Sequence, residues 1–395
     1  MRARAAIAFG TALIFLFALG LWLGGHPGKL PGAIRDLFVS EPVGLTAEAT
    51  EVIEDNYYRE VGQKELSNAS LQGLVRELRK RNDDRFSEYF SPEALEHFNE
   101  AISGRFSGIG LSVTEVKRGL RADRVFHGSP AAAAGIEVGD VVVSVNGKSI
   151  SGESSAAATA RIKGPEGTEV TVGVLRPRTG KVRQLRLTRA EVELPVVSSK
   201  VVAVGPRKLG YVRLVTFSEG AHALLERGVR KVQRGGAEGI LLDLRGNGGG
   251  LLQEAVLTAS VFLPEDEVVV TTDSRTQGHA EYRAVGGNLP ALPIVVLIDG
   301  NTASAAEILT AALADDAGAA VAGTTSYGKG VFQQEIELEN GGALKLTIGE
   351  YFTPDGTNLA GKGIRPDVPA PNDPATPADE GKQRALRALA GRVEG

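Results

Sequence analysis

The spacing of hydrophobic residues divides the chain into three stretches of different character. Between residues 46 and 102, apolar residues recur at helical spacing in three short runs. We expect the first helix to follow Thr46 as its N-cap and the second to cover Ser70 to Leu78. The third is expected from Pro92 to Ile102, because proline is favoured at the first helical position. This stretch predicts a small helical region to which we assign no chemistry.

From about residue 105 to 189 the pattern changes to short β-branched runs separated by glycine-rich turns. Thr168 to Leu175 and Arg183 to Leu187 have the composition of strands, and Ser154 to Ile162 that of a helix. The Asn146-Gly147 pair after another apolar run is typical of a tight hairpin turn. This stretch predicts a small, mainly β domain.

From residue 209 onward, strands and helices alternate. Gly239 to Leu244 and Ile294 to Ile298 are continuous apolar runs, as expected for strands covered on both faces, and Ala221 to Arg234 is an amphipathic helix. The sequence therefore predicts a layered α/β domain, followed by a proline-rich stretch and a surface helix at Asp379 to Ala390. The other expected elements are helices at Leu252 to Phe262 and Ser304 to Ala314, and strands at Gly210 to Leu214, Ala319 to Ala322 and Val331 to Leu338.

Composition narrows the possible functions. A chain of 395 residues is long enough for two or three domains. Its net charge of -4 gives no support to nucleic-acid binding, and the absence of cysteine excludes disulfides and thiol nucleophiles. The five histidines show no metal-binding spacing. We therefore expect no metal and no cofactor.

The N-terminus carries a membrane signal. Arg2 and Arg4 precede an uncharged run from Ala5 to Leu23, which at helical rise is nearly as long as a hydrocarbon core is thick. The basic flank predicts that the N-terminus stays cytoplasmic. We favour an uncleaved anchor, and a cleaved signal peptide is the alternative. Either way, we expect a membrane-associated protein whose main body lies outside the cytoplasm, in a periplasmic or extracellular space.

Three clusters in the α/β domain carry candidate chemistry. The run from Leu242 to Leu251 places glycines between a buried strand and a helix, where free backbone N–H groups stabilise developing negative charge. Ser304 also stands between a strand and a helix, where a lone serine is usually an N-cap. Lys329 lies between two glycines and can act as a base only if its pKa is lowered. A phosphate-binding or packing loop and a solvated lysine are the plainer interpretations of the first and third clusters.

The mainly β stretch resembles a PDZ domain. The resemblance is carried, in order, by Gly108-Ile109-Gly110-Leu111, Ser129-Pro130-Ala131, Ala134-Gly135-Ile136 and Gly139-Asp140-Val141-Val142 with Val145-Asn146-Gly147. A glycine-rich loop before a strand presents N–H groups to a carboxylate, and the strand edge accepts an added peptide strand. The resemblance implies that Gly108, Ile109, Gly110 and Leu111 bind the C-terminus of a substrate. A simple turn at the two glycines is the alternative.

Taken together and in this order, the clusters resemble the C-terminal processing peptidases, or tail-specific proteases, over roughly residues 45 to 370. The closing Gly363-Ile364-Arg365-Pro366-Asp367 segment is part of that resemblance. The resemblance implies that Ser304 is the nucleophile, Lys329 the general base and Gln333 the group that orients the lysine. It also implies an oxyanion hole made by the backbone N–H groups of Ala305 and of Gly250, with Gly249 as the alternative.

Two positions depart from the family pattern. Gly248 stands where the family's glycine loop often has proline, which loosens the loop without removing donors. Ala306 replaces the second serine of the nucleophile motif, and this serine is not the nucleophile. Neither change removes a group that the expected chemistry needs.

The predicted fold is of the mixed α/β class with several domains, and the resemblance implies a crotonase- or ClpP-like layered catalytic core. Expected partners are proteins or peptides with free, unstructured C-termini, the membrane through the N-terminal segment, and a further copy of the chain or an adaptor. The expected organisation is a signal anchor or signal peptide at residues 1–25, a linker at 26–44, a helical region at 45–104, a PDZ domain at 105–190, a catalytic core at 191–370 and a tail at 371–395.

Three other functions are alternatives to this interpretation. Gly323 to Lys329 fits the first part of a P-loop, but Gly330 stands where that motif needs Ser or Thr, and the following residues alternate like a strand. A Ser-His-Asp hydrolase is disfavoured because no Gly-x-Ser-x-Gly elbow surrounds Ser304. A catalytically silent PDZ-type binding or adaptor protein outside the cytoplasm is the main alternative to a serine endopeptidase that cleaves near the C-termini of exported or unfolded proteins.

Overall fold

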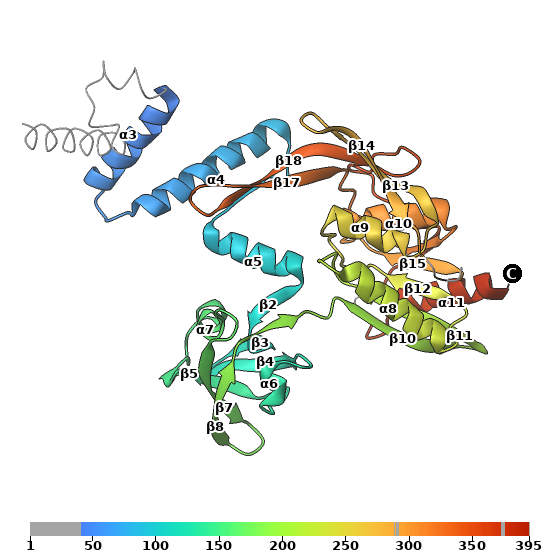
Figure 1. The fold of residues 1–395 in the computed structure, drawn as a ribbon, viewed down its shortest axis with the longest axis horizontal. Coiled ribbons are helices and arrows are strands. Elements are labelled where there is room, and N and C mark those ends of the chain that lie inside the picture. Colours follow the sequence, from blue (N-terminus) through green and yellow to red (C-terminus); the bar gives the residue numbers. More distant parts are fainter. Residues whose placement is uncertain (1–40, 288, 290–291, 373–375, 395) are drawn as a thin grey trace, which may run out of the picture. The chain divides into compact units, whose positions relative to one another are not determined.

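The computed structural model describes residues 41–287, 289, 292–372 and 376–394 (Figure 1). These residues form two compact units. The first comprises the described residues up to Ser91 together with Glu335–Leu346, and the second comprises Pro92–Gln334 together with the chain from Thr347 onward. The domain boundaries expected from the sequence stay predictions.

The first unit contains two helices and a short strand pair. Helix α3 spans Glu41–Asn56, helix α4 spans Gln63–Asn82, and strand β1 (Glu88–Phe90) pairs antiparallel with residues 343–345. The expected N-cap role of Thr46 is wrong, because Thr46 lies inside α3, where its carbonyl accepts from the Thr50 hydroxyl at 2.9 Å. In the part of the chain that the structure describes, no helix is long and apolar enough to cross a membrane. The expected anchor at Ala5 to Leu23 lies outside that part.

The second unit begins with helix α5 (Pro92–Ser103), which leads into the mainly β stretch. Strands β2 (Arg105–Gly108) and β9 (Ala190–Glu193) pair antiparallel where the chain enters and leaves this stretch. A sheet in the order β3-β4-β5-β7-β8 follows, with β3 at one edge. The elements of this stretch are β3 (Leu111–Val116), β4 (Gly119–Val125), α6 (Pro130–Ala133), β5 (Val141–Val145), β6 (Lys148–Ser149), α7 (Ser155–Ile162), β7 (Glu169–Arg176) and β8 (Lys181–Thr188).

The α/β stretch is built on one sheet with the order β10-β11-β12-β15-β16-β19. The pair β10–β11 is antiparallel, and the pairs from β11 to β19 are parallel. The buried runs predicted at 239–244 and 294–298 are confirmed as central strands. The strands are β10 (Val197–Val204), β11 (Arg207–Leu214), β12 (Ile240–Asp243), β15 (Ile294–Ile298), β16 (Ala320–Gly323) and β19 (Val368–Pro369).

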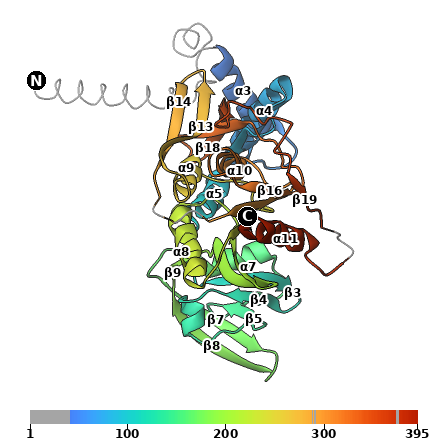
Figure 2. The same ribbon diagram turned by 90° about the vertical axis from the view of Figure 1, so that its right-hand side faces the viewer.

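Helices cover both faces of this sheet, because alternate residues of each buried strand point to opposite sides. Helices α8 (Ala221–Arg234), α9 (Leu252–Ser260) and α10 (Ala305–Asp316) pack on one face with one set of strand residues. Helix α11 (Glu380–Glu394), dark red in Figure 2, packs on the other. The expected surface helix is confirmed: its apolar face, with Ala385, Leu386 and Leu389, is buried against the sheet, and Gln383, Arg384 and Arg387 are exposed. The mixed α/β fold class is confirmed.

A second sheet, which the sequence patterns did not predict, contains four long strands. Strand β13 (Glu265–Ser274) lies between β14 (Gly278–Val285) and β18 (Ala343–Phe352), and β17 (Val331–Glu337) also pairs with β18. Strand β17 was predicted, and it carries the residues that follow Lys329. A strand after Lys329, in place of a helix, removes the structural basis of a P-loop.

Candidate active site

The three chemical clusters lie at one edge of the parallel sheet. The glycine-rich loop follows β12, Ser304 follows β15, and Lys329 follows β16. Because β15 pairs in parallel with both β12 and β16, the carboxyl ends of these strands are adjacent. Ligand and catalytic sites of parallel sheets form at that edge. Segments up to 86 residues apart in sequence, from Asp243 to Lys329, therefore reach the same place.

Ser304 has a strained backbone. It immediately precedes α10, with φ 58° and ψ -122°, whereas an ordinary N-cap residue is extended. Such a conformation costs on the order of 1–3 kcal/mol in a residue other than glycine and clusters at functional sites. The side chain is half-buried. A strained serine at a strand-to-helix turn is the arrangement that presents a nucleophilic hydroxyl.

Glu307 holds the backbone of Ser304 and that of Lys329 together. Its carboxylate is fully buried and accepts hydrogen bonds from the Ser304 N–H at 2.9 Å and the Lys329 N–H at 3.0 Å. The Gly328 N–H donates to the same carboxylate at 2.7 Å, and the Ser326 hydroxyl donates at 2.6 Å. Four donors match the acceptor capacity of an ionised carboxylate. The structure thus brings the serine and lysine segments together around one buried charge.

Two further features lie close to this shared carboxylate. Burial, and then the charge of Glu307, raise the pKa of Tyr351, so its phenol stays neutral. The Tyr327 N–H also donates to the Thr302 carbonyl at 2.9 Å, which adds a second link between the two segments. Sequence reasoning missed Glu307. The available signal was its spacing, since glutamate three residues after a serine is the pattern of a capping box.

Lys329 contacts the glutamine that the sequence assigned to it. Its Nζ donates to Gln333 Oε1 at 2.7 Å, and Gln333 Nε2 donates to Thr347 Oγ1 at 3.3 Å. The flanking glycines are explained by close backbone packing. A Cβ at Gly330 would lie 2.1 Å from Asn358 Oδ1, and one at Gly328 would lie 2.7 Å from a backbone nitrogen. The lysine is therefore carried by a tightly packed segment and is itself half-buried.

The glycine-rich loop lies against Ser304. Its buried Asn247 accepts from the Gly249 N–H at 2.9 Å through the side chain and from the Ala303 N–H at 3.0 Å through the backbone. A Cβ at Gly249 would lie 2.8 Å from the Cβ of Ser304 and 3.0 Å from the nitrogen of Ala305. Since the Gly249 N–H is already engaged by Asn247, Gly250 is the better candidate for the second oxyanion donor. The candidate for the first is Ala305, in the first turn of α10.

The residues expected to bind a C-terminus border a small apolar pocket beside edge strand β3. The loop from Gly108 to Leu111 lines it from one side, and α7 lines it from the other. The pocket has a volume of about 50 Å³. Its remaining lining residues are Phe106, Val113, Thr159, Ile162 and Lys163. The sequence-predicted binding residues are thus together at a groove next to a strand edge.

Comparison with known proteins agrees with this architecture. Residues 208–370 match the model of peptidase family S41, and residues 123–176 match a PDZ domain. The carboxy-terminal processing protease CtpA of Bacillus subtilis is 32% identical over 323 residues, which cover 82% of this chain and 68% of that protein. This chain belongs to peptidase family S41. It is a serine-type peptidase with a PDZ domain, as the sequence resemblance predicted.

Two further similar proteins extend the comparison. A CtpA-like serine protease of Staphylococcus aureus is 34% identical over 320 residues, which span 80% of this chain and 62% of the length of that relative. A crystal structure described as an S41 protease from Bacteroides fragilis aligns with a TM-score of 0.50 at 18% identity. It covers 87% of this chain and 97% of that structure, which supports the shared fold.

The glycine loop of this S41 peptidase offers a matched test of the site geometry. We expect Gly249→Ala to lower kcat about 100-fold, because the new Cβ would displace Ser304 or Ala305 and a displacement near 1 Å has an effect of this order. Gly249 also has φ 99°, which disfavours alanine. Steady-state peptide hydrolysis measures the effect.

The control is Gly248→Ala, one residue earlier in the same loop. An added Cβ at Gly248 meets no described atom within 4 Å. We expect its kcat to stay within about twofold of the wild-type value. Equal losses in the two variants would show that the loop tolerates no side chain at all, and would contradict a specific contact at Gly249.

Proposed function

We propose that this chain is a serine endopeptidase in which Ser304 attacks the peptide carbonyl and Lys329 acts as the general base. The observation that carries the proposal is the buried Glu307 carboxylate, which binds the backbone N–H groups of both residues. A catalytically silent binding protein would not need a strained serine whose backbone shares a carboxylate with that of a lysine. It would also not need Gln333 to orient that lysine.

The chemistry follows from these groups. Neutral Lys329 takes the proton of the Ser304 hydroxyl as its oxygen bonds to the substrate carbonyl carbon. The N–H groups of Ala305 and Gly250 stabilise the oxyanion, an effect of about 3 kcal/mol per donor. Protonated Lys329 then donates to the leaving amine. Water then attacks the acyl-enzyme, Lys329 accepts the proton of the water, and it returns this proton to the Ser304 oxygen as the acyl C–O bond breaks.

The substrates that we propose are proteins with free, unstructured C-termini. The loop from Gly108 to Leu111 would receive the terminal carboxylate, and the edge of β3 would pair with the preceding residues as an added strand. The apolar pocket between the loop and α7 favours an uncharged last side chain. A body outside the cytoplasm, held by the segment Ala5 to Leu23, and exported or unfolded substrates are part of the same proposal.

A pair of peptides tests capture of the C-terminus. We expect a disordered substrate with a free carboxylate to be cleaved with a kcat/KM about tenfold higher than the same peptide carrying a C-terminal amide, because the amide removes a charge-assisted interaction. Mass spectrometry identifies the cleavage sites. Equal kcat/KM values for the two peptides would contradict capture of the carboxylate.

Ser304→Ala separates catalysis from binding in the same assay. We expect this variant to bind the free-carboxylate peptide with wild-type affinity while producing no new termini. If wild type and variant both bind and neither cleaves, the chain is the catalytically silent binding protein that was the alternative function. Residual cleavage by the variant at the wild-type rate would exclude Ser304 as the nucleophile.

A further inference from the structure

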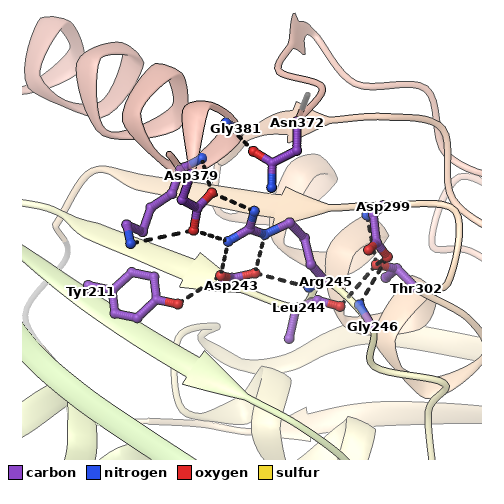
Figure 3. A network of polar contacts seen from close by, with 11 residues as sticks. Tyr211, Asp243, Leu244, Arg245, Gly246, Asp299, Thr302, Asn372, Asp379 and Gly381 are labelled. Atoms are coloured by element: carbon purple, nitrogen blue, oxygen red, sulfur yellow. Dashed lines mark hydrogen bonds and ion pairs between the residues drawn. The ribbon is translucent and has the colours of Figure 1, made fainter. Parts of the chain in front are cut away.

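An ion-pair network outside the proposed catalytic groups holds the start of the glycine-rich loop (Figure 3). Its centre is the guanidinium of Arg245. Nε and one terminal nitrogen donate to the two oxygens of Asp243 at 3.0 and 2.7 Å. The two terminal nitrogens donate to the two oxygens of Asp379 at 2.8 and 2.9 Å. Arg245 therefore joins the end of β12 to the residue that precedes α11.

Asp243 explains why the arginine is needed at this position. Its carboxylate is fully buried, accepts from the Tyr211 hydroxyl at 2.8 Å, and also accepts from the backbone N–H of Arg245 at 3.1 Å. A buried carboxylate without a cation is strongly destabilising. Burial, together with the charge of Asp243, raises the pKa of Tyr211 to about 12. The pair of Asp243 and Arg245 is thus part of the core itself.

Asp379 has a different position. It lies at the surface side of the guanidinium and is about one third exposed, 32% for the side chain. Its carboxylate also accepts from the Lys382 N–H at 3.0 Å, which fixes it to the first turn of α11. The apolar face of α11 is buried against the sheet. The carboxylate that binds Arg245 is therefore held in place by a helix that packs against the sheet.

The loop that follows Arg245 depends on such contacts because glycine gives it little stiffness of its own. Gly246, Gly249 and Gly250 all have positive φ, at 71°, 99° and 149°. Gly246 is bound through its N–H to Asp299 Oδ1 at 3.0 Å, and Asn247 is bound through its side-chain amide to the Leu214 carbonyl at 3.0 Å. Arg245 is the anchor that precedes these contacts, four residues before Gly249.

We propose that Asp379 is a positioning residue for catalysis, which acts through Arg245 to fix the loop that supplies the Gly250 donor. The inference rests on the proposed oxyanion role of that loop. The position of α11 is thereby linked to the proposed oxyanion site. The helix supplies no group to the reaction, but it helps to determine where the Gly250 N–H lies.

The test compares Asp379→Asn with a control in the segment that precedes α11. Asparagine keeps the shape of the Asp379 side chain but removes the negative charge that binds the Arg245 guanidinium in a bidentate ion pair. Asn372→Ala removes a different contact at the start of α11, the acceptance of the Gly381 N–H at 2.8 Å, and leaves the hydrogen bonds of Arg245 to Asp243 and Asp379 in place. Both variants should lower the melting temperature slightly. Kinetics are measured on the full chain, well below both melting temperatures, with a peptide substrate.

We expect Asp379→Asn to lower kcat about tenfold with KM within twofold, because the oxyanion donor contributes mainly in the transition state. Asn372→Ala should leave both constants within twofold. A second readout is the rate at which an organophosphonate labels Ser304, since its phosphoryl oxygen occupies the oxyanion position. That rate should fall by the same factor in Asp379→Asn only.

Several outcomes would overturn the proposal. Wild-type kcat in Asp379→Asn, or equal losses in both variants, would mean that Asp379 acts only on stability. If Asp379→Asn does not fold, Asp379→Glu is measured instead, because glutamate keeps the charge and moves the carboxylate. Unchanged kcat and an unchanged labelling rate in Asp379→Glu would then contradict the positioning role of Asp379. Failure of the proposed function itself is recognised separately, because Ser304→Ala would then retain cleavage activity.

Discussion

Replacing Lys329 by alanine is expected to lower kcat by about 10⁴-fold or more without unfolding the protein. Removal of the base from a serine peptidase has an effect of this size, because the hydroxyl is then a poor nucleophile and the leaving amine has no proton donor. The side chain of Lys329 is half-buried, and its Nζ donates to Gln333 at 2.7 Å. The backbone N–H that binds Glu307 remains in the variant. Hydrolysis of a disordered peptide, with circular dichroism as the folding check, measures the effect.

Lys329→Arg distinguishes a base from a mere positive charge. Arginine keeps the cation but cannot be deprotonated in proteins, so it should be as inactive as alanine. Lys231→Ala, at an exposed position in the last turn of α8, serves as a control for the loss of a lysine and should keep wild-type kcat. An active Lys329→Arg variant would limit Lys329 to electrostatic stabilisation, and full activity of Lys329→Ala would remove the base role altogether.

The elements of the catalytic core were predictable where one periodicity dominated. Ile294 to Ile298 was expected from its continuous apolar run and is a central strand with both faces covered. Helix α8 was expected at its observed bounds because its apolar residues follow a single helical stripe. The meeting of the three clusters is also accessible from sequence, since each follows a parallel strand at the same sheet edge.

Other features could not be read from local pattern. Strands β13 and β18 mix polar and apolar residues, and their pairing joins residues about 80 positions apart, such as Thr271 with Phe352. Helix α11 was expected at the surface, but its packing against the sheet was not, because Ala385, Leu386 and Leu389 form only a short apolar stripe among charged residues. What buries this stripe is the tertiary contact with the sheet. The contact of Arg245 with Asp379 spans 134 residues and leaves no local signal.

Glu307 was overlooked for a related reason. In the sequence it is one acidic residue in the first turn of an apolar helix, where a favourable interaction with the helix dipole is sufficient explanation. Its partners Gly328 and Lys329 lie more than 20 residues away, so the pattern around Glu307 contains no trace of them. Only the fold shows that the carboxylate binds the backbone of both Ser304 and Lys329, and this makes its replacement informative.

Glu307→Gln is expected to lower kcat about 10³-fold and to cost about 3 kcal/mol of the free energy of unfolding. Each carboxylate oxygen accepts two hydrogen bonds, one pair from Ser304 and Lys329 and the other from Ser326 and Gly328. An amide NH₂ in place of either oxygen would face two donors and leave them unpaired in a buried site. Ser304 and Lys329 would then lose the carboxylate that binds them both.

Glu254→Gln is the matched control, because Glu254 is another buried carboxylate that accepts backbone N–H groups, from Gly220 at 2.8 Å and His222 at 3.0 Å. The chemical change and the burial are alike, but neither partner belongs to the proposed catalytic groups. Urea unfolding should show comparable losses for the two variants. Measured in the folded state, kcat should fall only for Glu307→Gln. A common fall in kcat would mean that general loosening of the core, and not the shared anchoring of Ser304 and Lys329, limits the rate.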